Sequence, residues 1–218
     1  MGGLPSARGA ERIFTRVQTR VKAMTDTSHD HEIVSIYGFS DAQIDRLLED
    51  AAECVLMWAT RDSWPVGVIH AFVWKDKRVW LTFAEHRHRA AAIRRNPKVS
   101  VCVSSSSARS KDSPRGAATM KGRAIFHDDQ ATKDWFYRAL ARKVSPDNKA
   151  GEEHFFGILD SPLRTILEIV PEKWITYDAE KAGRDMAGAL PESEKTPRMS
   201  ADATRMNKER ARRGLPPR

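Results

Sequence analysis

The sequence predicts a mainly β domain of antiparallel strands with peripheral helices. Two stretches rich in Val, Ile, Phe and Trp, residues 65–74 and 79–83, flank the polar turn 75–77, a pattern typical of a β-hairpin. Residues 98–104 alternate Val with Ser and Cys, which is the period of a strand with one buried face. Other strand-like stretches are 54–60, 118–127, 163–171 and 173–178. Most of the folded part is therefore expected to be sheet.

Helices are expected before and after this set of strands. Ser40 with a Gln three residues later matches a capping box, and apolar residues then recur on one helical face to about Ala52. Residues 129–144 carry apolar side chains at three- and four-residue steps, and residues 152–159 are expected to form a shorter second helix. The strands should thus be covered by helices at their ends and on the outside.

A short helix with a basic first turn is predicted between the hairpin and strand 98–104. Residues 90–93 favour helix, and Asn96-Pro97 ends it, because the residue before a proline avoids the helical region. Arg87 and Arg89 lie in the leading turn, where backbone N–H groups have no partner inside the helix. Both features favour an anion, and a phosphate is the anion that fits best.

The hairpin, this basic segment and the run Arg-Arg-Asn-Pro-x-Val-Ser-Val resemble a known family. It is the flavin-binding split-barrel family of pyridoxamine 5'-phosphate oxidase and its deazaflavin-using relatives, and the resemblance covers about residues 40–178. The family's phosphate-binding basic residue precedes the proline by eight positions, which is Arg89 here. The pyridoxamine oxidases have an Arg-Lys pair where this chain has His88 and Arg89. The resemblance implies an antiparallel split β-barrel of six or seven strands.

The resemblance also implies a cofactor and an assembly. Split-barrel relatives are homodimers whose flavin sites lie in clefts shared by both subunits, so we expect a homodimer that binds flavin mononucleotide (FMN) and acts on a small molecule. The 8-hydroxy-deazaflavin coenzyme is the alternative, and the sequence does not choose between the two.

Seven residues are candidates for binding the cofactor. Arg87 and Arg89 are the first choice, because a guanidinium group donates two hydrogen bonds to neighbouring phosphate oxygens. The others are Thr82, Val68, His70, Lys121 and Trp174. Five of them also have a purely structural interpretation. The arginines could form a solvated basic helix face, and the other three could be a strand-end threonine, a surface lysine and a core tryptophan. Val68 and His70 are expected to offer backbone groups to the flavin ring. The catalytic residues are unknown.

Motifs of other enzyme classes are not found. The chain has no Gly-x-Gly-x-x-Gly fingerprint, no Gly-Lys-Ser phosphate loop, no Gly-x-Ser-x-Gly elbow and no His-Glu-x-x-His site. His86 and His88 beside Glu85 suggest a metal, but at a helix start a two-residue spacing separates them by about 200°. We therefore expect no metal site, and a flavin would supply the redox chemistry itself.

Composition describes a cytoplasmic protein with basic ends. The net charge is +8, but residues 1–24 and 181–218 hold surpluses of four and five positive charges, so residues 25–180 carry a net charge of −1. Nucleic acid is therefore an unexpected partner. No apolar stretch approaches the roughly twenty residues of a membrane span. Cys54 and Cys102 are expected to be buried, reduced thiols.

The chain is expected to have three parts. Residues 1–39 form a basic N-terminal extension, in which an Arg at every fourth position from Arg8 to Arg20 leaves open a targeting or membrane-surface helix. Residues 40–178 form the flavin-binding split-barrel domain. Residues 179–218 form a polar, basic tail with too little apolar surface to order itself, so we expect it to be extended or disordered.

The function expected from these observations is that of a flavin-dependent oxidoreductase of the pyridoxamine 5'-phosphate oxidase-like class. A deazaflavin-dependent reductase of the same fold, or a non-catalytic flavin- or haem-binding protein, stays open as an alternative. Oxidation of pyridoxamine phosphate itself is not expected, because the Arg-rich C-terminal substrate motif of those oxidases is not recognisable here.

Overall fold

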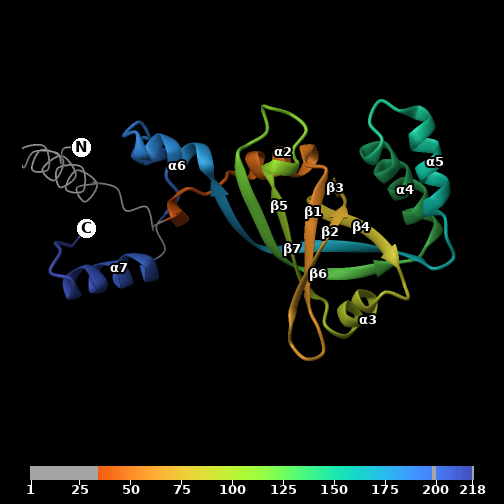
Figure 1. The fold of residues 1–218 in the computed structure, drawn as a ribbon, viewed down its shortest axis with the longest axis horizontal. Helices are drawn as coiled ribbons and strands as arrows, with labels where there is room; N and C mark the ends of the chain where they lie inside the picture. The colour runs from red at the N-terminus through yellow and green to blue at the C-terminus, as the bar shows by residue number, and fades with distance from the viewer. Residues whose placement is uncertain (1–33, 198–199, 218) are drawn as a thin grey trace, which may run out of the picture.

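A curled, seven-stranded antiparallel sheet forms the centre of the molecule, with helices around it (Figure 1). The structure is a computed structural model that describes residues 34–197 and 200–217. The strands are β1 (Glu53–Ala59), β2 (Pro65–Ala71), β3 (Val73–Lys75), β4 (Arg78–Ala84), β5 (Lys98–Ser104), β6 (Gly116–His127) and β7 (Arg164–Asp178). The order across the sheet is β2-β1-β5-β6-β7-β4-β3. The predicted mainly β fold of six or seven antiparallel strands is confirmed.

The two edge strands of this sheet are consecutive in the chain. Phe72 alone separates β2 from β3, and its side chain is fully buried. β2 pairs with β1 while β3 pairs with β4, so the chain bends at Phe72 and changes partners. The prediction of one strand over 65–74 paired with 79–83 is therefore wrong for residues 65–71. The bend lets the sheet curl round until its two edges meet in one stretch of chain.

The β3–β4 hairpin itself is as predicted. Asp76 and Lys77 form its two-residue turn with φ values of 54° and 60°, the left-handed conformation that matches the twist of the flanking strands. The predicted strands 163–171 and 173–178 are a single strand, β7. The predicted break coincides with an irregularity in the pairing, because Lys121 of β6 faces Lys173 and Gly122 faces Pro171, which leaves Glu172 without a cross-strand partner. A Cβ on Gly122 would lie 2.6 Å from the carbonyl oxygen of Val170, so this crossing requires glycine.

The concave face of the sheet holds the main core. Alternate residues of each strand point into it, and α2 (Asp41–Asp50) closes one end with the buried Leu47 and Leu48. The predicted capping box of α2 is present, because the Ser40 hydroxyl accepts from the backbone N–H of Gln43 and the Gln43 side chain accepts from the N–H of Ser40. The buried strand residues are Cys54, Leu56, Val79, Leu81, Phe83, Val99, Val101, Val103, Ala118, Met120, Ala124, Leu167 and Ile169.

The convex face is covered over only part of its width. α4 (Gln130–Val144) and α5 (Lys149–Leu159) lie together at one side in Figure 1 and pack on β3, β4 and β7. Elsewhere one row of cross-strand partners runs over five strands on this face: Ile69, Val55, Cys102, Thr119 and Ile175. We call this set the outer row. Its two end residues are 63% and 54% exposed, so an apolar band of the sheet faces solvent.

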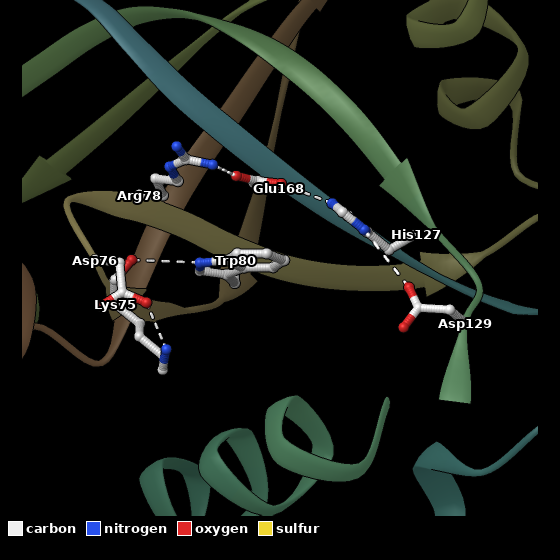
Figure 2. Close-up of polar contacts among 7 residues, drawn as sticks. All are labelled: Lys75, Asp76, Arg78, Trp80, His127, Asp129 and Glu168. Atoms are coloured by element: carbon white, nitrogen blue, oxygen red, sulfur yellow. Dashed lines mark hydrogen bonds and ion pairs between the residues drawn. The ribbon is translucent and has the colours of Figure 1, made fainter. Parts of the chain in front are cut away.

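A buried carboxylate links the covered strands to α4 (Figure 2). Glu168 of β7 accepts a hydrogen bond from Arg78 of β4, and its other oxygen lies 2.6 Å from Nε2 of His127 at the end of β6. Nδ1 of His127 faces Asp129 at 3.7 Å, and Asp129 caps α4 by accepting from the N–H of Thr132. The ring of Trp80 packs beside His127 with centroids 5.3 Å apart. This chain of polar contacts ties three strands and one helix together.

Replacing Glu168 by glutamine is expected to destabilise the fold by about 1.5–3 kcal/mol, the range for a lost charge-assisted hydrogen bond. The loss stays below the roughly 3–5 kcal/mol of a fully buried pair, because the Arg78 side chain is 45% exposed and reaches water. Urea unfolding of the purified variant measures it. Glu172→Gln is the matched control, since its pair with Arg123 is half exposed on both sides and should contribute less than about 1 kcal/mol. Equal losses for the two variants would contradict this account.

The expectation of an extended C-terminal tail is wrong for its described part. α6 (Ala179–Met186), the short η3 (Glu192–Glu194) and α7 (Ser200–Arg212) are helical. The hydroxyl of Tyr37 donates to Asp185 at 2.6 Å, and the Lys195 ammonium pairs with the same carboxylate. Ile36 at the end of η1 (Val34–Ile36) adds apolar contact to α6. Residues that precede the first strand thus supply the apolar contacts that order the tail. The predictions for residues 1–33 lie outside the described residues.

Both cysteines are free, as predicted. Cys54 points into the core, and burial raises the pKa of its thiol to about 12, which keeps it unreactive. Cys102 lies in the outer row and is partly exposed, so only Cys54 fits the predicted burial fully. Among the helices of the described residues, none is long and apolar enough to cross a bilayer.

Candidate functional site

The start of α3 (His88–Arg95) is open to an anion. Its N-cap is Arg87, whose side chain makes no capping hydrogen bond. The other α-helices whose N-caps lie within residues 34–197 are each capped by an oxygen-bearing side chain: Ser40, Asp129, Asn148 and Asp178. The unpaired backbone N–H groups at the start of α3 are therefore available to a ligand, and they favour a negative one.

Arg89 lies in the first turn of α3 and reaches towards β2. Its Nη1 donates to Nε2 of His70 over 2.8 Å. Its guanidinium carbon lies 5.5 Å from the ring centre of Phe83 and 5.9 Å from that of Trp58, so two aromatic rings flank the charge. In the part of the chain that the structure describes, no carboxylate pairs with Arg89. A partly buried cation here lacks an anionic partner.

The electrostatics of this cluster are positive. Burial lowers the pKa of Arg89, and the charge of Arg87 lowers it further. Burial also lowers the pKa of His70, to about 4, with the charge of Arg89 as the second cause. His70 is thus neutral near pH 7. Because a guanidinium only donates, Nε2 of His70 is the acceptor and Nδ1 carries the proton.

β2 presents an open edge beside this cluster. It is the last strand of the sheet on its side and pairs only with β1, so about half of its backbone N–H and C=O groups point away from the sheet. Val68 and His70 pair with Leu56 and Cys54 of β1, which face the core. Their side chains therefore point to the same, concave face of the sheet. The structure thus brings Arg89 to His70. The charge of Arg87 acts on Arg89, and Val68 lies two residues before His70 on the same strand face.

Thr82 is not part of this cluster. It is buried, and its hydroxyl donates to the carbonyl oxygen of Thr165 over 2.7 Å. Its neighbour Phe83 points into the core beside Arg89, and successive strand residues point to opposite faces. The structure therefore places the Thr82 side chain on the convex side of β4.

Lys121 lies on the convex face of β6, beside the outer row. It lines an open hollow of about 570 Å³ whose walls include Met57, Trp58, Pro65 and Glu172. Trp58 is the link to the first cluster, because it lines this hollow and also contacts Arg89. Lys121 is therefore near the candidate site but on the other side of the sheet.

Trp174 lies in a different place. It packs edge to face on Trp74, with ring centroids 6.1 Å apart, and the indole N–H of Trp74 donates to Asp45 of α2 over 3.1 Å. The two tryptophans line a hollow of about 450 Å³ beside the β3–β4 turn. The structure does not bring Trp174 to Arg89.

The histidines near α3 form no metal cluster. Glu85 accepts two hydrogen bonds from Arg94, at 2.8 and 2.9 Å, while His86 and His88 are exposed. Among the described residues, no three His, Cys, Asp or Glu side chains come together as metal ligands.

Sequence reasoning missed the two aromatic walls of the cluster, Trp58 and Phe83. A usable signal exists for Trp58, because strand periodicity places it on the same face as Cys54 and Leu56. No local signal shows that β4 and β1 both face α3, since this depends on how the sheet curls.

Comparisons with known proteins agree with this fold. Residues 40–178 match the family model described as pyridoxamine 5'-phosphate oxidase. The comparison with curated proteins gave no match.

Among solved structures, the conserved hypothetical protein Rv2991 of Mycobacterium tuberculosis superposes with a TM-score of 0.56 at 16% identity, over 76% of this chain and 93% of that one. ChuZ of Campylobacter jejuni gives 0.51 at 14%, over 65% and 57%. A protein of unknown function from Agrobacterium tumefaciens gives 0.50 at 15%, over 78% and 70%. At these identities the similarity shows a shared fold.

Proposed function

The chain belongs to the pyridoxamine 5'-phosphate oxidase family, and on that premise we propose that it is an oxidoreductase that binds FMN through the start of α3. The observation that carries this proposal is the partly buried guanidinium of Arg89, which has no carboxylate partner among the described residues and lies beside an uncapped helix start. A phosphate would supply the missing negative charge to both.

The residues present fit a flavin phosphate and ring. Arg87 and Arg89 would hold the phosphate, and the open backbone edge of β2 at Val68 and His70 would hydrogen-bond the polar rim of the ring. The aromatic rings of Trp58 and Phe83 keep Arg89 in place and limit its access to water. When bound, a flavin supplies hydride or electron transfer, while the protein positions substrate and cofactor.

A second copy of the chain is expected to pack on the outer row. Apart from Thr119 the outer row is apolar, and it ends in two exposed isoleucines, Ile69 and Ile175. Such a band is a typical protein interface, and the hollow lined by Lys121 lies on the same face. We therefore infer a homodimer that pairs through this face and acts on a small-molecule substrate. Two free cysteines suit the cytoplasm.

Ile175→Glu is expected to shift the protein from dimer to monomer, because it places a charge in the inferred interface, at an exposed end of the outer row. Size-exclusion chromatography with light scattering measures the mass of the particle. Ile158→Glu is the matched control, since Ile158 is similarly exposed, 51% against 54%, but lies on α5 away from the outer row. A monomeric wild type, or a dimer that survives Ile175→Glu and dissociates with Ile158→Glu, would contradict the inferred face.

The cofactor and the activity are tested on the purified protein. Mass spectrometry of copurifying small molecules should identify FMN, with flavin absorbance at about 450 nm, and NADPH should reduce the bound flavin. If a deazaflavin copurifies instead, the proposal of FMN as the cofactor is wrong. Bound FMN that no reductant or substrate turns over would leave a binding protein instead of an enzyme.

A further inference from the structure

His70 supplies the hydrogen-bond acceptor that the guanidinium of Arg89 uses among the described residues. The imidazole is held from two sides. It packs against Phe83 with ring centroids 6.0 Å apart, and its backbone is fixed in register opposite Cys54 of β1. The Nη1 to Nε2 distance of 2.8 Å thus joins two side chains that the surrounding strands keep in place. His70 therefore sets where the Arg89 guanidinium lies.

We propose that His70 is a proton-linked positioning residue, which accepts a hydrogen bond from Arg89 and takes up a proton when a phosphate group binds. The inference rests on the proposed function, since it concerns the same phosphate site. The proton comes from solvent, and no covalent bond forms or breaks.

The charges around His70 support this coupling. From α3, Arg89 faces the ring directly, and the charge of the N-cap residue Arg87 acts on Arg89. From β1, Cys54 contributes a thiol that stays neutral, and Phe83 of β4 contributes no charge. Burial, together with the positive charge of Arg89, holds the pKa of His70 at about 4, and among the described residues no negative charge counts among the causes. A phosphate dianion at Arg89 reverses the local sign, which favours the imidazolium form.

The direction of the pH effect follows from linkage. If the phosphate raises the pKa of His70 above its free value of about 4, the complex binds more protons than the free protein between these two pKa values. Affinity for the phosphate then rises as pH falls through that window, by at most about tenfold per pH unit for one proton. Below the free pKa both states are protonated, and no further gain is expected.

The test compares FMN with riboflavin, which lacks the phosphate. Flavin fluorescence titrations from pH 7.5 to pH 5 are run on wild type and His70→Asn, because asparagine still accepts from Arg89 but does not titrate. The ionisation of the FMN phosphate is common to both proteins and cancels in the ratio of their affinities. We expect the wild type to gain several-fold over His70→Asn as pH falls, for FMN alone. His88 is an exposed histidine in the first turn of α3. His88→Asn should therefore keep the wild-type pH profile.

Parallel pH profiles for wild type and His70→Asn would overturn the inference, as would loss of the pH dependence in His88→Asn instead. Equal affinity of wild type for FMN and riboflavin would refute the phosphate site itself, so the two failures are distinguishable. If His70→Asn does not fold, histidine NMR titration of the wild type decides the question. The His70 ring should titrate at higher pH with FMN than with riboflavin, and an unchanged midpoint would overturn the inference.

Discussion

Arg89→Ala is expected to weaken FMN binding by roughly 10- to 100-fold while leaving riboflavin binding nearly unchanged. The expected loss corresponds to one charge-assisted pair, about 1.5–3 kcal/mol. Arg89 qualifies because its guanidinium is partly buried, lies at the first turn of α3 and has no carboxylate partner in the described chain. Flavin fluorescence or calorimetric titration gives both affinities.

Arg95→Ala is the matched control for this result. Arg95 belongs to the same helix and carries the same charge, but it is exposed in the last turn. Its replacement removes the general attraction of a basic helix, which salt screens, and should change FMN affinity by less than threefold. A loss in Arg95→Ala equal to that in Arg89→Ala would mean that only net charge matters, and the solvated basic face would be the correct reading.

Phe72→Ala is expected to destabilise the fold by about 3–5 kcal/mol, the range for truncating a buried aromatic residue. Phe72 is fully buried and joins the two edge strands of the sheet, and the Lys143 ammonium lies 4.0 Å from its ring centre. Because β2 and β3 depend on this joint, their amides should also lose hydrogen-exchange protection. Urea unfolding gives the change in free energy.

Phe72→Leu separates the joint from simple apolar burial. It keeps most of the apolar volume, so it should cost less than about 1.5 kcal/mol and preserve exchange protection in β2. A loss below 1 kcal/mol in Phe72→Ala would show that the barrel does not depend on this position.

Local chemistry made much of the fold predictable. The capping box at Ser40, the alternation of β5 and the turn of the β3–β4 hairpin each depend on residues a few positions apart. Such signals survive in any tertiary context, and each of these elements is present. The overall β class followed from them because there are several such strands and few competing helices.

Long-range geometry was not predictable in the same way. The bend at Phe72 follows from closure of the sheet, in which residues 65–71 pair with β1 and residues 73–75 pair with β4. The ordered tail depends on Tyr37, which lies 148 residues before its hydrogen-bond partner Asp185. Composition alone therefore underestimates the order of a tail whose apolar contacts come from the other end of the chain.

The candidate site shows the same division. Arg87 and Arg89 were proposed from the basic helix turn, and Arg89 also from its resemblance to the family's phosphate-binding position, eight residues before Pro97. The structure brings Arg89 to His70. Thr82 is next to Phe83 in the sequence, but its side chain points to the opposite face of β4 and bonds Thr165. Trp174 packs on Trp74 and does not reach Arg89. Which face a strand residue occupies depends on register, which is set by pairing partners far along the chain.

A crystal structure of the protein with FMN tests the central claim most directly. The account predicts the phosphate oxygens within hydrogen-bonding distance of the Arg89 guanidinium and of the backbone N–H groups that open α3. FMN bound with its phosphate elsewhere, for example in the hollow lined by Trp74 and Trp174, would contradict it, as would a guanidinium still bonded to His70 alone beside a bound flavin.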